Sequence, residues 1–315
     1  MEVIKSESKL ALENVLGMKG GDGESSYAKS SSVQLNMVQA TKPILERAIY
    51  ENMRLTSNVG GVFRVADFGC GTGENTLVVV NTIVNAVQRS FEEHEIPEFE
   101  VPESVQQRRS PRVYVSGDFE ESVGAAYLQQ FDKDFTAFLK ARAEELVDGG
   151  CMFVSLPGRN EGTHMMEEQG ICGFVARQIE YAFEELVNEG IVEKEKWESF
   201  KIPFFGPNSD EVESIVKKEG SFVLKFVKTL EGIYPYCMID FERGEANMFG
   251  RLIANNYRAA FENIVETHLG CKRSTEELFS RIGKRASILI KEYLSKETKL
   301  VVAFLIKKGV HNNTY

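Results

Sequence analysis

Apolar positions along the chain recur at two spacings, and the spacing separates predicted helices from predicted strands. The helical spacing marks the stretches 1–17, 32–52, 75–93, 121–147, 168–190, 210–219, 245–268 and 275–295. Short and nearly continuous apolar runs predict strands at 62–68, 151–156, 222–230 and 299–306. Another strand begins at Phe99, but its pattern stops almost at once. Because strands alternate with long helices, we expect an α/β protein with a doubly wound, mostly parallel sheet.

The helix-rich stretch at residues 169–218 lies between predicted strands, and we expect it to form a cap over the carboxyl edge of the sheet. Residues 1–168 and 219–315 are then expected to form one α/β core. A chain of 315 residues is long enough for such a core with an inserted cap.

Charge and composition exclude several classes of partner. The formal charge is −10 and the isoelectric point is near 5.2, so the surface repels phosphate backbones and nucleic acid is not an expected partner. The longest apolar runs, such as 301–306, are too short to span a bilayer, and the chain begins with no secretory segment. Five widely spaced cysteines and four scattered histidines form no disulfide or metal pattern. We therefore expect free thiols, no metal, no membrane and a cytoplasmic protein.

A glycine-rich turn follows the predicted strand 62–68 and carries Gly69, Gly71 and Gly73. Glycines let the backbone turn sharply and approach a ligand, and the next helix adds its positive dipole end. A dinucleotide fingerprint would place its third glycine at position 74, where the charge of Glu74 would face the pyrophosphate. The turn therefore favours S-adenosylmethionine, whose cationic amino group could be bound by Asp67. A tight strand-to-helix turn without any ligand is the alternative.

A second glycine-rich stretch, at residues 18–27, leads into a helix that presents Tyr27 and Gln34. Asp22 and Glu24 make this stretch unsuitable for phosphate. Spacing alone favours a solvent loop with a helix cap over a binding loop.

Resemblance to a known family changes that balance. Residues 18–34 resemble the N-terminal signature of the plant SABATH methyltransferases, which methylate salicylic, benzoic, jasmonic and indole-3-acetic acids, gibberellins and xanthine alkaloids. Further resemblance, in the same order, covers the segments 66–70, 138–146, 189–192 and 218–222. The resemblance runs from about residue 14 to residue 307 and implies a Rossmann-like class I methyltransferase sheet with a helical cap. It also implies S-adenosylmethionine as methyl donor, S-adenosylhomocysteine as product, and a homodimer.

The resemblance assigns roles to individual residues. Tyr27 is expected beside donor and substrate, and Gln34 is expected to hold the substrate carboxylate, which makes these two the predicted catalytic residues. The implied donor site contains Lys19, Ser26, Tyr27, Asp67, Gly69, Cys70, Gly71, Gly73 and Asn75. The implied substrate pocket contains Tyr27, Gln34, Phe174, Val175, Ala176 and Leu300. Smaller residues at 176 and 300 than in salicylate-type members resemble the roomier pockets of indole-acetate and gibberellin members, although ordinary core positions are the alternative.

The sequence departs from the family at the junction of Glu100 and Val101. The family has there a ribose-binding aspartate, an adenine-packing segment and a strand that ends in a His-Trp pair. Without that strand, the strands at 62–68 and 151–156 would have unpaired edges, and each buried unpaired group costs roughly 1–3 kcal/mol. Either the sequence omits residues that the molecule contains, or the chain is a truncated form without activity. Because every remaining segment still resembles the family, we favour the first alternative, that the sequence omits residues present in the molecule.

The turn at residues 197–203 is the place where some family members hold magnesium through an aspartate and an asparagine. Glu198 and Lys201 stand there in this chain, and a lysine cannot coordinate a cation, so no metal is expected.

The resemblance predicts an O-methyltransferase that forms the methyl ester of a small carboxylic acid of the plant-hormone or phenylpropanoid type. A carboxylic acid has a reference pKa of about 4, so it needs no general base at neutral pH. Orientation alone can supply about 7–11 kcal/mol of the barrier. An N-methyltransferase of the xanthine type, or a truncated non-catalytic relative, is the alternative.

Overall fold

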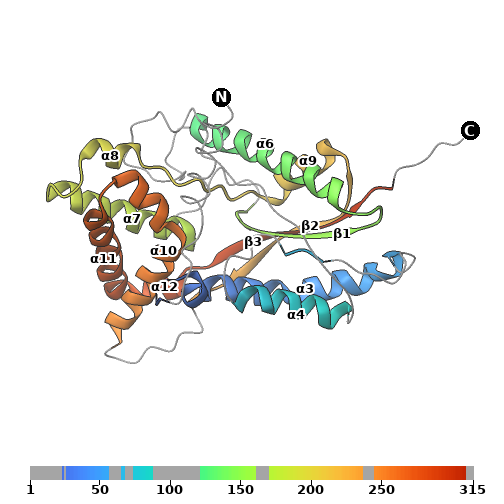
Figure 1. The fold of residues 1–315 in the computed structure, drawn as a ribbon, viewed down its shortest axis with the longest axis horizontal. Coiled ribbons are helices and arrows are strands. Elements are labelled where there is room, and N and C mark those ends of the chain that lie inside the picture. Colours follow the sequence, from blue (N-terminus) through green and yellow to red (C-terminus); the bar gives the residue numbers. More distant parts are fainter. Residues whose placement is uncertain are drawn as a thin grey trace, which may run out of the picture.

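The computed structural model describes residues 23–24, 26–56, 65–67, 74–87, 121–160, 170–236 and 245–309. The helices of this part (Figure 1) are α2 (Tyr27–Ser30), α3 (Ser32–Thr56), α4 (Glu74–Val87), α6 (Glu121–Glu145), α7 (Ile171–Asn188), α8 (Lys194–Ser199), α9 (Ser209–Glu219), α10 (Ala246–Leu269), α11 (Lys272–Ile288) and α12 (Ile290–Ser295). The strands are β1 (Cys151–Gly158), β2 (Phe222–Ile233) and β3 (Thr298–Lys307).

Most predicted elements are confirmed, with ends that move by a few residues. The predicted helix 275–295 is interrupted at Leu289, which separates α11 from α12, and the short helix α8 was not predicted. Of the predicted strand 62–68 only residues 65–67 are described, and they lie in no helix or strand. The predicted helix at 1–17 and the strand that begins at Phe99 lie outside the described residues.

Strand β3 lies between β1 and β2 in the described sheet, and both ladders are antiparallel. The expectation of parallel pairing is therefore wrong for these strands. β2 ends at Ile233, directly opposite Thr298, where β3 begins. Because the intervening chain leaves and returns at the same end of the sheet, it makes a hairpin connection and not the crossover that parallel strands need. No other described strand pairs with β1.

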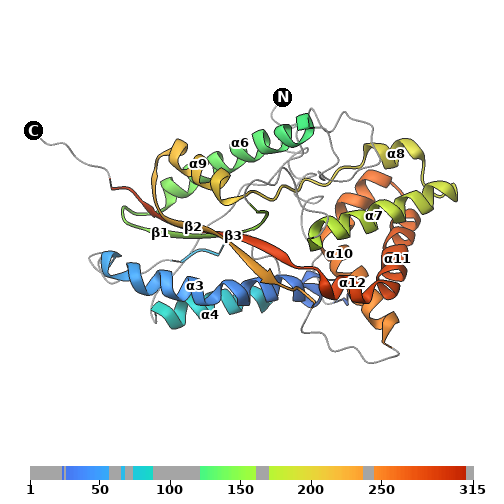
Figure 2. The ribbon, with the colours of Figure 1, turned by 180° about the vertical axis from the view of Figure 1, so that it is seen from behind.

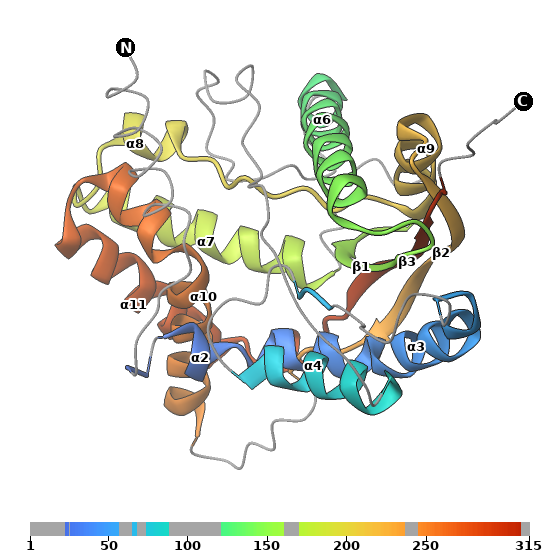
Figure 3. The same cartoon turned by 45° about the vertical axis from the view of Figure 1, so that its right-hand side comes forward.

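Helices cover both faces of the sheet (Figure 3), with α6 and α9 on one side and α3 and α4 on the other. Side chains of β3 alternate between the two faces. Val301 and Leu305 pack with Phe135 and other residues of α6 and α9, whereas Phe304 and Ile306 pack on the side of α3. Burial on both faces explains the continuous apolar run that predicted this strand.

A second core lies in the helical body, which we define as α7, α8, α10, α11 and α12 (Figure 2). Helices α10 and α11 approach closely where Gly250 meets Gly283. A Cβ atom on Gly250 would overlap the carbonyl oxygen of Gly283, and one on Gly283 would lie 3.0 Å from the carbonyl oxygen of Gly250. The predicted cap, residues 169–218, divides between two surroundings: α7 and α8 belong to the helical body, but α9 packs on β2 and α6.

Candidate active site

A cavity of about 160 Å³ lies where the first turns of α3 meet the helical body. Its walls come from α3, α7 and α10 and from the segments that follow α8 and β2. Three residues of the expected substrate site line it, namely Gln34 on α3 and Val175 and Ala176 on α7. The hydrogen bond from Asn36 Nδ2 to the carbonyl oxygen of Pro235, at 2.6 Å, holds α3 against the chain after β2. The fold thus brings together residues that are far apart in the sequence.

The cavity lining is apolar, and none of the described side chains that form it is charged. Burial raises the pKa of the Tyr236 phenol to about 12 and that of the Cys172 thiol to about 11, so both groups are neutral at physiological pH. Gln34 provides a polar group of another kind, because its buried Oε1 has no hydrogen-bond partner in the described chain. An amide can be turned end for end, so its nitrogen can equally face the cavity and donate to a carboxylate oxygen.

Three other predicted substrate residues, Tyr27, Phe174 and Leu300, do not belong to the described lining of this cavity. The ring of Phe174 meets that of Tyr293 edge-on, with centroids 5.0 Å apart, and Lys296 Nζ lies 5.3 Å above it. Phe174 directly precedes Val175 in α7, and successive helical positions point about 100° apart. Leu300 is buried inside the sheet, opposite Pro157 and Leu230. Its position in the middle strand keeps it away from the cavity lining.

Ser26 and Tyr27 of the expected donor site are buried. Tyr27 lies on α2, which packs against α10, and the neighbouring Ser26 hydroxyl has no partner in the described chain. Asn75 Nδ2 donates to the carbonyl oxygen of Ser31 at 3.1 Å and to its hydroxyl oxygen at 3.0 Å. Asn75 is the second residue of α4. Its amide ties α4 to the junction of α2 and α3.

Asp67 has the electrostatic character of a cation-binding carboxylate. Its Oδ2 atom is buried and has no hydrogen-bond partner in the described chain, and burial raises its pKa to about 6. A cationic amino group beside it would favour the ionised form and lower that pKa. Asp67 therefore suits a donor that carries such a group. The other expected donor residues, Lys19, Gly69, Cys70, Gly71 and Gly73, lie outside the described residues.

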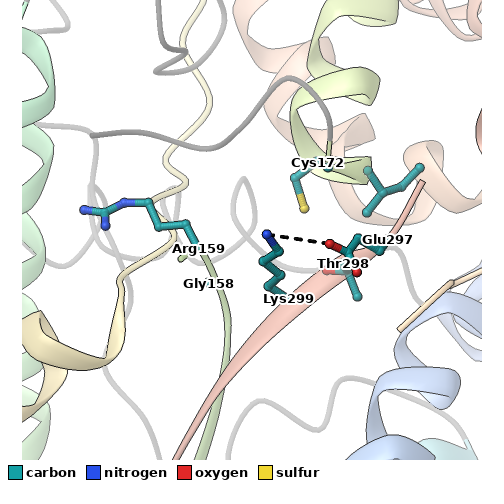
Figure 4. Close-up of a pocket in the computed structure, with 8 residues that line it drawn as sticks. Gly158, Arg159, Cys172, Glu297, Thr298 and Lys299 are labelled. Carbon is teal, nitrogen blue, oxygen red and sulfur yellow. Dashed lines mark ion pairs between the residues drawn. The ribbon is translucent and has the colours of Figure 1, made fainter. Parts of the chain in front are cut away.

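A smaller cavity, of about 30 Å³, adjoins the first one at Ile171 and Cys172 (Figure 4). Lys299 Nζ lies 3.6 Å from Glu297 Oε1 at its edge. Arg159 also lines it, and its guanidinium extends away to pair with Glu211 and to face the ring of Phe205. A space of this size suits water and not a substrate.

The turn that holds magnesium in some family members carries its own cation here. Lys201 is buried, and its Nζ donates to the carbonyl oxygens of Glu198 at 2.8 Å and of Phe200 at 3.0 Å. Across the described residues, no group of three or more His, Cys, Asp or Glu side chains is arranged to hold a metal ion.

Sequence reasoning did not select Asn256, Tyr236 or Tyr257, which also line the larger cavity. A signal for Asn256 was present. The buried stripe of α10 contains Phe249 and Ile253, and Asn256 continues it at helical spacing. A polar residue at a core position of an amphipathic helix marks a buried polar site.

Comparison with known proteins gives consistent matches along the whole chain. A sequence profile described as "SAM dependent carboxyl methyltransferase" matches residues 13–102 and 99–308. The "Probable jasmonic acid carboxyl methyltransferase 1" of Theobroma cacao is 28% identical over 381 aligned positions that cover 94% of this chain and 99% of the relative. The "Salicylate carboxymethyltransferase" of Clarkia breweri is 28% identical over 368 positions, covering 95% and 99%. The structure titled "Loganic acid methyltransferase with SAH" superposes with a TM-score of 0.78 at 24% identity and covers 94% of this chain and 100% of its own. The fold is therefore that of an α/β methyltransferase.

The same matches locate residues that this chain lacks. The two matched parts of the profile meet at residues 99–102, the place of the junction between Glu100 and Val101. The alignment with the cacao protein is longer than the 315 residues of this chain, so it must contain positions with no counterpart here.

No helix in the described ranges is both long enough and apolar enough to cross a bilayer.

Proposed function

The chain belongs to the SAM-dependent carboxyl methyltransferase family, and from this premise we propose that it forms the methyl ester of a small carboxylic acid with an apolar body. The observation that carries the proposal is the cavity in which Gln34 stands among apolar and neutral side chains. Such a lining accepts the body of an acid and offers one amide to its carboxylate. Charged substrates without an apolar body gain little from it.

S-adenosylmethionine supplies the methyl group from its sulfonium when bound. We propose that Asp67, with Ser26, binds the amino group of the donor, because its buried carboxylate has an unpaired oxygen and a raised pKa. Lys19, Tyr27, Gly69, Cys70, Gly71, Gly73 and Asn75 complete the proposed donor site.

The proposed mechanism needs orientation and exclusion of water. Gln34 donates to one carboxylate oxygen of the acid, and we propose that Tyr27, which is buried on α2, lies beside the donor and the substrate. The acid is already ionised at neutral pH, so no residue has to remove a proton. Val175 and Ala176 hold the apolar body. An amide-to-carboxylate hydrogen bond fixes the direction of attack, and orientation of this kind lowers barriers by about 7–11 kcal/mol.

The size of the cavity limits the substrate. An apolar cavity of about 150 Å³ is large enough for a benzene ring, so about 160 Å³ suits an acid with one ring. We therefore favour single-ring acids of the phenylpropanoid or benzoate type over tetracyclic gibberellins. We further propose a cytoplasmic homodimer with residues 169–218 as a cap, on the basis of the composition and the family resemblance.

The test is incubation of the purified protein with methyl-labelled S-adenosylmethionine and a panel of single-ring acids. A labelled product that base hydrolyses is a methyl ester and supports the proposal, whereas a base-stable product indicates N-methylation. A folded protein of 35.4 kDa by intact mass that labels no acid would show that the chain is a non-catalytic relative. A larger mass would show that residues are missing at the junction of Glu100 and Val101.

A further inference from the structure

The amide of Asn256 is a buried polar group whose hydrogen bonds are unmade. Its side chain is 6% exposed, and neither Nδ2 nor Oδ1 has a hydrogen-bond partner in the described chain. Leaving a buried amide unsatisfied costs free energy, so natural cores seldom keep one without a use. Asn256 lines the same cavity as Gln34, and it does so from a different helix, α10.

The neighbours of Asn256 leave its amide available. Tyr236 is near enough for the amide to influence its phenol, but the two form no hydrogen bond of normal geometry. Other rings hold Tyr236 in place, because it meets Phe249 edge-on at 6.0 Å and Tyr293 edge-on at 5.8 Å. Burial raises the pKa of Tyr257 well above its ordinary value, so this phenol also stays neutral beside the amide.

We infer that Asn256 determines specificity by binding a second polar group, such as a ring hydroxyl, on the acid whose carboxylate Gln34 holds. This inference rests on the proposed function. An amide both donates and accepts, and so does a hydroxyl, which makes the two complementary. An acid with an unsubstituted ring would leave both amide atoms unpaired, and sites built to bind a hydroxyl discriminate strongly against analogues that lack it. The substrate class is therefore a single-ring acid that carries a hydrogen-bonding substituent on its ring.

The experiment compares kcat/KM for benzoate, phenylacetate and cinnamate with that for their ring-hydroxylated isomers, in the wild type and in Asn256→Leu. We expect the wild type to prefer at least one hydroxylated isomer over its parent acid on the order of tenfold or more. Leucine branches at the same atom with the same number of side-chain heavy atoms and needs no hydrogen bond, so the variant should fold. Its kcat/KM should fall for the hydroxylated acid and stay unchanged for the parent acid, so that the preference disappears. An unchanged ratio in Asn256→Leu would overturn the inference.

Asn255→Leu is the matched control, because it makes the same change one position away, outside the cavity lining, and should keep the wild-type ratio. Calorimetric binding of the same acids in the presence of S-adenosylhomocysteine separates this inference from the proposed function. If the protein binds acids with an Asn256-dependent preference but methylates none, the inference stands and the catalytic proposal fails. If acids are methylated without that preference, the inference alone fails. If no acid binds, both fail.

Discussion

Asn75 Nδ2 donates to both the carbonyl oxygen and the hydroxyl oxygen of Ser31, at 3.1 and 3.0 Å. Ser31 separates α2, which carries Tyr27, from α3, which carries Gln34. One amide therefore connects the helix after the glycine-rich turn to the two segments that bear the proposed catalytic residues. If these residues have the proposed roles, we expect donor binding and substrate positioning to be coupled through this contact.

Substituting Asn75 by alanine tests that coupling. Because two buried hydrogen bonds are lost, we expect a free energy of unfolding lower by about 1–3 kcal/mol, together with weaker binding of S-adenosylhomocysteine. Urea unfolding and calorimetry measure the two effects. Asn81→Ala changes an exposed asparagine of the same helix and should alter neither. Wild-type behaviour of Asn75→Ala would refute the coupling.

The raised pKa of Asp67 predicts how donor affinity depends on pH. The pKa is about 6 in the free protein because burial disfavours the charged form, whereas the bound amino group requires that form. Binding of S-adenosylhomocysteine should therefore strengthen as pH rises through 6, by about tenfold from pH 5 to pH 7, and should level off above. Calorimetry at several pH values measures it.

Asp67→Asn provides the control for that pH series. The amide cannot titrate, so affinity should be low and nearly independent of pH in this window. The same slope in the variant and the wild type would mean that another group binds the amino group.

The stability of the free protein depends on pH in the opposite direction. A carboxyl group whose pKa is raised in the folded state stabilises the protein fully at pH values below its unfolded-state pKa, near 4. That contribution decreases as pH rises to 6.

Gln34→Leu removes the amide that we propose holds the substrate carboxylate. Hydrogen bonds to charged groups contribute about 1.5–3 kcal/mol, so kcat/KM for the acid should fall by roughly tenfold to a hundredfold. Gln34→Glu should fall further, since it places a negative charge against the carboxylate. Steady-state kinetics measure both, and donor affinity should not change. Gln39→Leu, at an exposed position of the same helix, should act as wild type; an equal loss there would point to helix damage.

Ala176→Phe tests whether the cavity is the place of the substrate. The added ring occupies much of the space of about 160 Å³, so methylation of ring-bearing acids should fall to background while donor binding persists. Glu184→Phe puts the same ring on an exposed position of α7 and should leave activity intact. Retained activity on cinnamate in Ala176→Phe would place the acid elsewhere.

The glycine crossing of α10 and α11 predicts an order of stabilities. Alanine is normally favoured over glycine inside a helix by about 0.5–1 kcal/mol, so a neutral site would gain stability. Here a methyl group on Gly250 would overlap the carbonyl oxygen of Gly283, whereas one on Gly283 would lie 3.0 Å from the carbonyl oxygen of Gly250. We expect Gly250→Ala to lower the unfolding temperature more than Gly283→Ala does, with a cost of about 1–3 kcal/mol for the former. A stabilised Gly250→Ala would contradict the close crossing.

The sequence predicted the elements better than their pairing. Periodicity located α3, α6, α7, α10 and β3, because amphipathic faces and a doubly buried strand leave a clear pattern. It could not show that β3 would enter between β1 and β2 in the opposite direction, because strand order depends on long-range packing. The interruption at Leu289 carries no proline or glycine, so no local pattern marked it.

The candidate site was predicted in part for a similar reason. Gln34, Val175 and Ala176 could be selected by their resemblance to a family motif, and they do share one cavity. Phe174 and Leu300 were selected by the same resemblance, yet they lie outside its lining. Phe174 faces another side of α7 than Val175, and Leu300 is buried in the middle strand of the sheet. Asn256 belongs to no family motif, and its place on the buried stripe of α10 was the one signal for it. The roles assigned to all of these residues remain predictions.

The pairing of Ile233 with Thr298 has a consequence for how such enzymes can diversify. Everything between these residues, including α10 with Asn256, is in topological terms the tip of a hairpin. Closing a longer or different loop between two fixed strand ends adds little entropy cost. A lineage can therefore replace the wall that we propose binds the acid, while the strands beside it keep their register. New substrates would arise by exchange of a module and not by redesign of the frame.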